Sequence, residues 1–206
     1  MDISLIFSLL SGVCILLAYI VYNKDAFLGL SKPNAVSWGL WTMVTILNMA
    51  SYFVMTGDIL KNSLPIVASF ACITTFGLAL YKKNYVPLST IEKLALTTGV
   101  IAIIGWYLFR SAVFANVILQ LANAAAFVPT YRSVWKNPAN EKPLPWGIFT
   151  TAYALLCITV LLRFDGKFAE LLFPFLGLIL HSSLTTLIIF RKRYSVQNGL
   201  AFSERL

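Results

Sequence analysis

Amide, aromatic and imidazole side chains recur at helical spacing inside the apolar runs of this chain. Three runs carry them: Trp41, Asn48 and Tyr52 in one; Asn116, Gln120 and Asn123 in another; and the single histidine, His181, in the last. Polar groups at the depth of a lipid bilayer are costly, so each needs a partner or a function. Amides donate and accept hydrogen bonds, and aromatic rings cover apolar ligand faces. The pattern predicts a central cavity for a small polar ligand, with Trp41, Asn48, Tyr52, Asn123 and His181 on its walls.

A second interpretation of the same residues stays open. Amides also join neighbouring membrane helices, through hydrogen bonds of about 0.6–2 kcal/mol each. Both interpretations apply equally to Asn48 and Asn123, whereas Asn116 lies near a membrane face, where the joining role is favoured. His181 is either a ligand-binding or pH-sensitive group, or a hydrogen-bonded histidine of the core.

The positions of the carboxylates and cysteines exclude several kinds of chemistry. Every Asp and Glu lies in a loop, at a terminus or at a helix end. No carboxylate is therefore expected to carry protons within the membrane, which favours a facilitator over a pump. A lone histidine makes neither a metal site nor a charge relay. Cys14, Cys72 and Cys157 lie in apolar runs and are expected to be small core side chains. We expect no enzyme and no cofactor.

The elements that position these residues are membrane spans. The chain has 206 residues, of which 59% are hydrophobic and only 12% charged, and apolar runs of about 20 residues cross a bilayer. Seven spans are predicted: 4–22, 36–56, 63–81, 90–109, 112–134, 145–162 and 168–190. The sequence therefore predicts an all-α membrane protein.

The distribution of Lys and Arg predicts how the spans are oriented. With seven spans, four basic residues lie on the side of the N-terminus: Lys61, Arg110, Arg163 and Lys167. The other twelve of the sixteen lie on the opposite side. Because cytoplasmic loops are enriched in Lys and Arg, we expect the N-terminus outside and the C-terminus in the cytoplasm. The net charge of +8 is explained in the same way.

An internal repeat divides the chain in two. Shifted by 108 positions, Trp38 matches Trp146, Gly39 matches Gly147 and Thr42 matches Thr150. This spacing predicts two three-helix bundles in the same orientation, joined by a linker helix, a 3+1+3 arrangement. The expected parts are a first bundle at 1–81, a linker with helix 4 at 82–111, a second bundle at 112–191 and a cytoplasmic tail at 192–206.

Two other features of the spans have an expected role. Trp38 and Trp146 begin their spans, where tryptophans form a belt at the membrane surface; we favour this interpretation over a role in the site. Pro129 lies inside a span, removes a backbone hydrogen bond and should bend the helix. We interpret it as a hinge.

This layout resembles the PQ-loop/SWEET superfamily of small membrane transporters, which have two three-helix bundles and a linker helix. Pro129-Thr130 followed by Lys136 is similar to the Pro-Gln dipeptide and lysine of that superfamily, with Thr130 in place of the glutamine. Other positions that fit the pattern are Ser37 and the Gly57-Asp58 turn. The resemblance implies the bundle architecture and a transport function.

The same comparison bears on the substrate. Sugar-carrying members have a Pro-Asn pair in the third helix of each bundle, where this chain has Pro65-Ile66 and Pro174-Phe175. The chain is also similar to nicotinamide-riboside (PnuC-type) vitamin transporters, which share the layout and a Trp-x-x-Trp element like Trp38-x-x-Trp41. The resemblance implies a small metabolite such as a sugar or a vitamin precursor.

We therefore expect a multi-pass integral membrane protein of a bacterial inner membrane, or alternatively of an organelle, working as a facilitator by alternating access. Its expected partners are a small-molecule substrate and the lipid bilayer; nucleic acid is not expected, and a homo-oligomer is left open. The alternative is a non-transporting receptor or assembly partner on the same scaffold, whose function would reside in the cytoplasmic segments 135–144 and 191–206. Alanine at Asn48 or His181 distinguishes the two, because only a cavity depends on these side chains.

Overall fold

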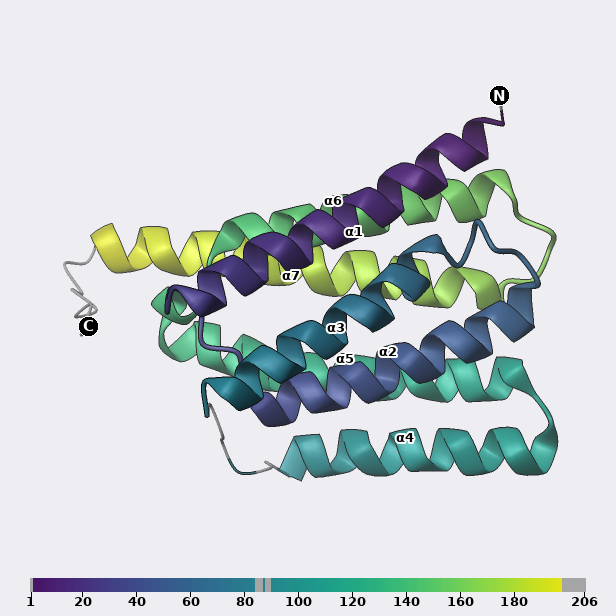
Figure 1. The fold of residues 1–206 in the computed structure, drawn as a ribbon, viewed down its shortest axis with the longest axis horizontal. Helices are drawn as coiled ribbons and strands as arrows, with labels where there is room; N and C mark the ends of the chain where they lie inside the picture. Colours follow the sequence, from purple (N-terminus) through teal and green to yellow (C-terminus); the bar gives the residue numbers. More distant parts are fainter. Residues whose placement is uncertain (1, 84–86, 88–89, 198–206) are drawn as a thin grey trace.

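The structure is a computed structural model that describes residues 2–83, 87 and 90–197, and these form seven α-helices and one 3₁₀ turn. The helices are α1 (Ile3–Phe27), α2 (Ala35–Thr56), α3 (Ser63–Tyr81), α4 (Thr90–Phe109), α5 (Ala112–Lys136), α6 (Pro143–Leu162) and α7 (Ala169–Gln197), with the 3₁₀ turn η1 (Pro138–Asn140) before α6. They lie alongside one another as a bundle (Figure 1). The prediction of an all-helical chain with seven helices is confirmed.

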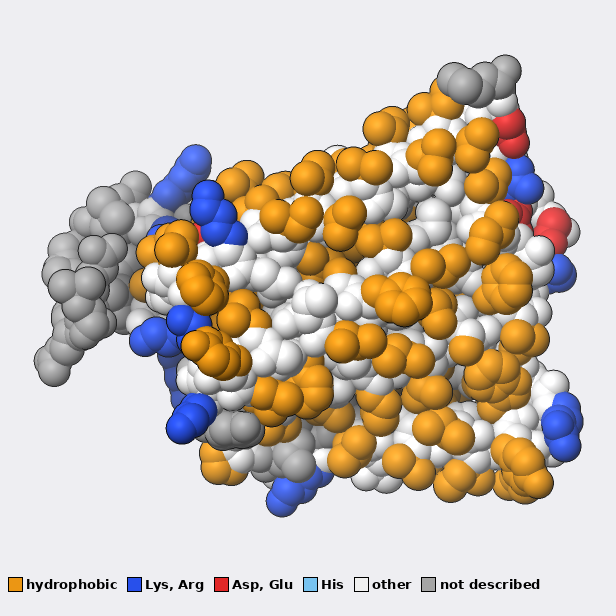
Figure 2. Space-filling model, in the orientation of Figure 1, with side chains coloured by type: hydrophobic (Ala, Val, Ile, Leu, Met, Phe, Trp, Pro, Cys, Tyr) orange, Lys and Arg blue, Asp and Glu red, His pale blue; other side chains and the backbone are white. Residues whose placement is uncertain are grey.

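The composition of the helices makes this a multi-pass membrane protein. Within the described residues, six helices are long and apolar enough to cross a bilayer: α1, α2, α3, α5, α6 and α7. In α4 the described apolar stretch, Leu96–Phe109, is shorter, although α4 lies beside α5 over most of its length (Figure 1). Hydrophobic side chains cover the flank of the bundle and charged ones gather at its two ends (Figure 2).

The ends of the helices match the predicted spans closely, with two exceptions. The first helix continues past residue 22 to Phe27, and the last continues past residue 190 to Gln197. The predicted tail at 192–206 therefore begins as helix, and its residues 198–206 lie outside the described part, as do 84–86 of the basic loop after α3. A helix can extend beyond the membrane where its last turns are basic, because positive charge is favourable at a helix C-terminus; Arg191, Lys192 and Arg193 lie there.

Six helices form a closed ring of neighbours. In the first part of the chain α3 packs between α1 and α2, and in the last part α7 packs between α5 and α6. The two parts meet where α1 packs on α6 and α2 packs on α5. The remaining helix, α4, packs mainly on α5 from outside the ring. The inside of the ring holds a core rich in aromatic residues, including Trp38, Trp41, Phe127, Trp146 and Tyr153.

Each end of the bundle has its own set of loops. We call the end where α1 begins the N-terminal end and the end where α7 finishes the C-terminal end (Figure 1). At the N-terminal end, α2 stops at Gly57, whose φ of 64° is the left-handed conformation that glycine adopts without strain. Gly166, with φ of 96°, lies in the corresponding turn after α6. The predicted turn at Gly57 is therefore present, and a second glycine turn lies at the same end.

Candidate functional site

Three spaces follow one another inside the bundle, starting at the C-terminal end. The wide cavity has a volume of about 410 Å³, and its walls include Tyr22, Lys32, Trp38, Trp41, Arg132 and Glu141. The aromatic space, of about 40 Å³, shares Trp38 and Trp41 with it. The amide space, of about 20 Å³, shares Thr45, Asn123 and Tyr153 with the aromatic space. The shared walls place the three spaces in series from the C-terminal end inward.

The size of these spaces determines what each can hold. Small-molecule sites have volumes of about 300–1,000 Å³, a range that the wide cavity reaches. A water molecule needs at least about 10–15 Å³, so the two inner spaces have room for little more than water. A ligand that moves inward from the wide cavity must therefore displace the aromatic side chains between them.

Trp38 and Trp146 lie inside the bundle, and the prediction of a membrane-surface belt is wrong for both. Trp38 is 4% exposed and Trp146 is 2% exposed. Trp38 packs edge-on against Trp41, with ring centroids 4.9 Å apart, and Trp146 lies 6.3 Å from Trp41. Their helices, α2 and α6, are not neighbours in the ring. The tryptophan side chains point into its interior, where Trp41 and Trp146 approach each other. Both tryptophans line the aromatic space.

Trp41 lies on the walls of the wide cavity and of the aromatic space, as predicted for a cavity residue. Its ring packs edge-on against Phe127 of α5 at 5.2 Å. Its indole nitrogen, Nε1, is buried and donates no hydrogen bond to any described residue. A buried donor of this kind is costly unless something accepts its hydrogen bond. Trp41 can therefore donate to an acceptor within these spaces.

Asn48 joins α2 to α5 through a cluster of amides. Its Oδ1 accepts hydrogen bonds from Asn116 Nδ2 at 3.0 Å and from Gln120 Nε2 at 2.8 Å. Asn116 is fully buried within the ring, one helical turn from the start of α5, and it has the joining role that was favoured for it. The joining role is thus observed for Asn48. Asn48 and Gln120 also line the amide space, where Gln120 Oε1 is buried and accepts no hydrogen bond from a described residue.

Tyr52 does not line any of the three spaces, in contrast to the prediction. It is fully buried nearer the N-terminal end, and its hydroxyl donates to the backbone oxygen of Glu170 in α7 at 2.8 Å. Its ring packs against Phe173 at 5.2 Å. Helical spacing put Tyr52 on the same face as Asn48, but one more turn along α2 carries it past the spaces and into the contact with α7.

Asn123 and His181 lie where they were predicted. Asn123 is on the walls of both inner spaces, and its side chain makes no hydrogen bond with any described residue. His181 Nδ1 lies 2.7 Å from the backbone oxygen of Gly177, which can only accept, so Nδ1 carries the proton. In a neutral imidazole Nε2 is then an acceptor. The ring stacks on Tyr153 at 4.6 Å, and a side chain at Gly177 would collide with that tyrosine.

Pro129 lies inside α5 and on the wall of the wide cavity. Thr130, the next residue, lines the same cavity. The helix continues on both sides of the proline, from Ala112 to Lys136. A hinge at this position stays a prediction.

Glu141 is a functional candidate that the sequence did not reveal, because it lies in a turn-rich loop that was expected to be exposed. Its side chain is buried, at 7% exposure, and lines the wide cavity. Oε1 accepts from the Tyr22 hydroxyl at 3.2 Å and Oε2 accepts from Trp146 Nε1 at 3.0 Å. Burial raises the pKa of Glu141 from 4.5 to about 7. The run Glu141-Lys142-Pro143 gave no signal of burial in the sequence.

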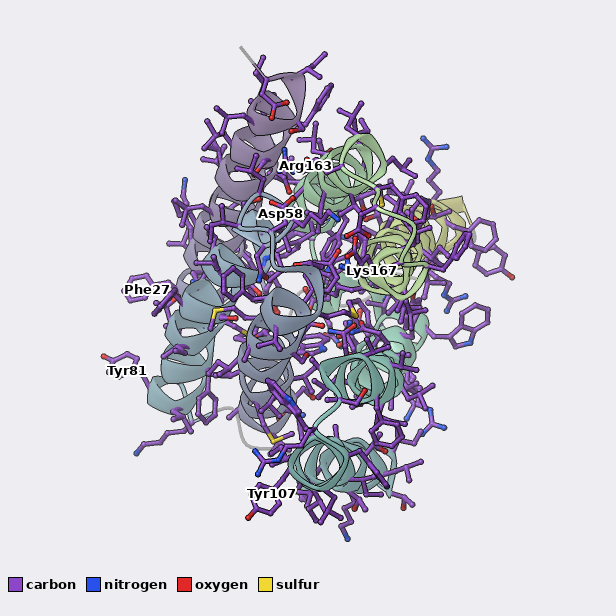
Figure 3. The ribbon with its side chains drawn as sticks, turned by 90° about the vertical axis from the view of Figure 1, so that its right-hand side faces the viewer. Phe27, Asp58, Tyr81, Tyr107, Arg163 and Lys167 are labelled. Atoms are coloured by element: carbon purple, nitrogen blue, oxygen red, sulfur yellow. The ribbon has the colours of Figure 1, made fainter. Side chains whose placement is uncertain are left out.

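The N-terminal end holds ion pairs that also escaped the sequence. Lys61, in the turn before α3, pairs with Glu170 of α7 at 2.5 Å, and both side chains are buried, at 2% and 0% exposure. Arg163 pairs with Asp58 at 2.5 Å and with Asp2 at 3.2 Å. Figure 3 looks onto this end and shows Arg163 and Asp58 side by side. Every one of these pairs links the first part of the chain to the last.

Phe27, Tyr81 and Tyr107 point away from the helices in the same view (Figure 3). They are 60%, 75% and 71% exposed, as expected for side chains that meet lipid or its headgroups. The three cysteines are free; Cys72 and Cys157 are buried and Cys14 is partly buried. Among the described residues, no group of three His, Cys, Asp or Glu is placed to hold a metal ion.

Comparison with known proteins gives no match: no family model, curated protein or solved structure is significantly similar to this chain.

Proposed function

We propose that this protein is a membrane transporter that moves a small polar metabolite by alternating access. The observation that carries the proposal is the contrast between the two ends. A cavity of ligand size leads inward from the C-terminal end, while buried and partly buried ion pairs tie the two halves together at the other end. A ligand site accessible from one side only is the arrangement that an alternating-access carrier adopts in one of its states.

The pattern of helix contacts supports a 3+1+3 arrangement of parallel repeats. Exchanging α1 with α5, α2 with α6 and α3 with α7 maps each contact between the six ring helices onto another one. The contact of α1 with α6, for example, becomes that of α5 with α2. This is the behaviour of two repeats related by a two-fold axis along the membrane normal. It extends the sequence repeat at 108 residues and agrees with the resemblance to the PQ-loop/SWEET architecture.

The charges at the two ends support an orientation with the C-terminal end in the cytoplasm. Four acidic residues lie at the N-terminal end beside its basic ones and form pairs with them: Asp2, Asp58, Asp165 and Glu170. At the C-terminal end Lys32, Arg132 and Lys136 form no ion pair with a described residue. An excess of Lys and Arg marks the cytoplasmic side. The wide cavity then faces the cytoplasm.

The chemistry of the spaces favours an uncharged or weakly charged polar ligand with an apolar face. Trp41 Nε1 is a donor without a described acceptor, Gln120 Oε1 is an acceptor without a described donor, and His181 Nε2 is an acceptor in the neutral ring. Aromatic rings make up most of the remaining wall of the aromatic space. A few polar groups set among rings are typical of small-molecule sites. Sugars and vitamin precursors have this character.

Thermal-shift screening of the purified protein tests the proposal with sugars, nucleosides, amino acids and vitamin precursors. A ligand that binds only the folded state raises the melting temperature, by an amount that grows with its concentration. We expect a hit that is lost in His181→Ala and in Asn123→Ala. Thr186→Ala, on an exposed position of the same helix as His181, is the matched control and should retain it.

Uptake of the hit into proteoliposomes then separates a transporter from a receptor. Flux that requires His181 and Asn123 supports the transporter. Binding without flux, or a hit that is equally strong in His181→Ala, would contradict it.

A further inference from the structure

Glu141 differs from the other buried carboxylate in what surrounds it. Glu170 is paired with Lys61. Glu141 forms no ion pair with any described residue, and its two oxygens accept hydrogen bonds from neutral groups, the hydroxyl of Tyr22 and the indole of Trp146. Two neutral donors compensate a buried negative charge only in part. The negative charge of Glu141 is therefore not balanced by a cation at ion-pair distance.

The charged groups around Glu141 come from every element that packs near it. Asp25 of α1 disfavours its negative charge and Lys192 of α7 favours it. Lys32, before α2, and Arg132 of α5 lie on the walls of the same cavity, and both are exposed to solvent, which screens them. Lys142 follows Glu141 in the chain. None of these cations lies within ion-pair distance of the carboxylate, so protonation remains a way to remove the buried charge.

Glu141 also connects the two halves of the bundle. Tyr22 belongs to α1, whereas Glu141 and Trp146 belong to the loop before α6 and to α6 itself. The contact between α1 and α6 is one of the two seams at which the halves meet. The hydrogen bond from Tyr22 to Glu141 crosses this seam at the C-terminal end, beside the wide cavity. A change at Glu141 therefore acts on this seam at the wall of the wide cavity.

We propose that Glu141 is a proton-binding site that faces the wide cavity and makes the seam between α1 and α6 depend on protonation. The proton arrives from cavity water and bonds to Oε1, converting the carboxylate to the neutral acid. Oε2 keeps its hydrogen bond from Trp146. The new O–H is a donor directed at Tyr22, so the bond to Tyr22 reverses and the tyrosine hydroxyl oxygen becomes the acceptor.

This site introduces a proton-dependent step in a protein for which the sequence indicated a simple facilitator. The proton site itself stands on the geometry of Glu141, Tyr22 and Trp146. Its consequence, a proton-linked transport cycle, rests on the proposed transport function. Burial, which raises the pKa of Glu141 to about 7, places the change of charge within the range of pH that a bacterial cell experiences.

The indole of Trp146 reports on Glu141 directly, because its N–H donates to that carboxylate. We would follow the ¹⁵N-indole resonances of the full-length protein in lipid nanodiscs from pH 5 to pH 9, with Trp146→Phe to assign the signal. The Trp146 resonance should titrate with a midpoint near 7 and should be flat in Glu141→Gln. Trp106, near the end of α4 at the N-terminal end, is the internal control and should not follow the same curve. A Trp146 signal that does not titrate, or that titrates equally in Glu141→Gln, would overturn the proposal.

A second variant keeps the test decisive if Glu141→Gln folds poorly. Tyr22→Phe removes one hydrogen bond that favours the charged form, so the midpoint should rise. An unchanged or lower midpoint would count against the proposal.

Flux measured with a pH difference separates this proposal from the transport function. With a midpoint near 7, the protonated fraction falls about tenfold between pH 6 and pH 8. Flux in the wild type should change by up to that factor, and flux in Glu141→Gln should not. A titrating Trp146 in a protein that moves no compound would contradict the transport function alone. Flux with a Trp146 that does not titrate would contradict the proton site alone.

Discussion

The two ends of this bundle each bury a glutamate, and the two are built differently. At the N-terminal end, Glu170 is fully buried and lies 2.5 Å from the ammonium of Lys61, with Lys167 3.8 Å from its other oxygen. At the C-terminal end, Glu141 is buried nearly as well but accepts hydrogen bonds from Tyr22 and Trp146, which carry no charge. Glu170 thus lies beside a cation, whereas Glu141 lies on the wall of the wide cavity.

This difference indicates what each end does. A buried carboxylate beside a lysine holds its elements together, since removing either charge leaves the other buried without a partner. A buried carboxylate with neutral donors can lose its charge by taking a proton from the cavity. The first arrangement suits an end that is closed in this state of the molecule. The second suits an end that opens or closes with the protonation of its carboxylate in the proposed cycle.

The largest effect on stability is expected at the buried ion pair. Glu170→Ala leaves the Lys61 ammonium buried without a partner, which typically costs about 3–5 kcal/mol. We expect a matching loss in the free energy of unfolding, measured by thermal or denaturant unfolding in nanodiscs.

A double variant, Lys61→Met with Glu170→Leu, is the control for this prediction. Replacing both charges by apolar side chains of similar size is often neutral or stabilising. The double variant should therefore be more stable than Glu170→Ala. If both lose the same stability, the pair is held by packing and not by its charges. Asp165→Asn, at an exposed pair with Lys167, should cause no measurable change.

The pH dependence of stability gives the next largest effect, at Glu141. Because its pKa is raised from 4.5 to about 7 in the folded protein, the folded state binds this proton more tightly than the unfolded state does. The favourable contribution is fully present below pH 4.5 and is lost as the pH rises through 7. The difference over this window is about 3 kcal/mol, at 1.36 kcal/mol per pH unit.

Comparison with Glu141→Gln isolates this contribution from those of other titrating groups. The free energy of unfolding of the wild type, relative to the variant, should rise as the pH is lowered from 8 to 5. A difference that stays constant with pH, or that changes in the opposite direction, would show that Glu141 is not buried in its neutral form.

The sequence was sufficient for the helices and for part of the site. Apolar runs of bilayer length identified seven helices, because lipid allows few other solutions for the backbone. Helical spacing also placed Asn48 on the polar face of one span and Asn116 and Gln120 along the polar stripe of another, and the structure joins these amides. Periodicity identifies the inward face of a helix, and that was enough for Trp41, Asn123 and His181.

The residues that the sequence missed are those whose environment comes from other parts of the chain. Glu141, Lys61 and Glu170 are charged residues in turns or at helix ends, where solvent exposure is the ordinary outcome. They are buried because distant segments cover them: α1 supplies Tyr22 for Glu141, and residues more than 100 positions apart form the Lys61–Glu170 pair. Trp38 and Trp146 were misplaced for the same reason, since a position at the start of a span does not tell which neighbour it faces.

The smallest effect is expected at Arg163, which tests whether the N-terminal end is closed by charge at its rim as well as in its interior. Its side chain is 32% exposed, and a pair of this kind contributes about 1 kcal/mol or less. Arg163→Ala should lower the free energy of unfolding by no more than that. Arg132→Ala, at the wall of the wide cavity, removes a cation with no described acidic partner and should cost less still.

A double-mutant cycle decides whether Arg163 acts through Asp58. If the ion pair at 2.5 Å carries the effect, Arg163→Ala and Asp58→Ala should each remove it, and combining them should remove little more. Losses that simply add would assign the effect to other contacts of each residue, such as that of Arg163 with Ser4. Suppose that Arg163 and Asp58 are coupled and that Arg132→Ala has no effect on stability. Charge pairs would then hold the N-terminal end together, while the C-terminal end is left free to open.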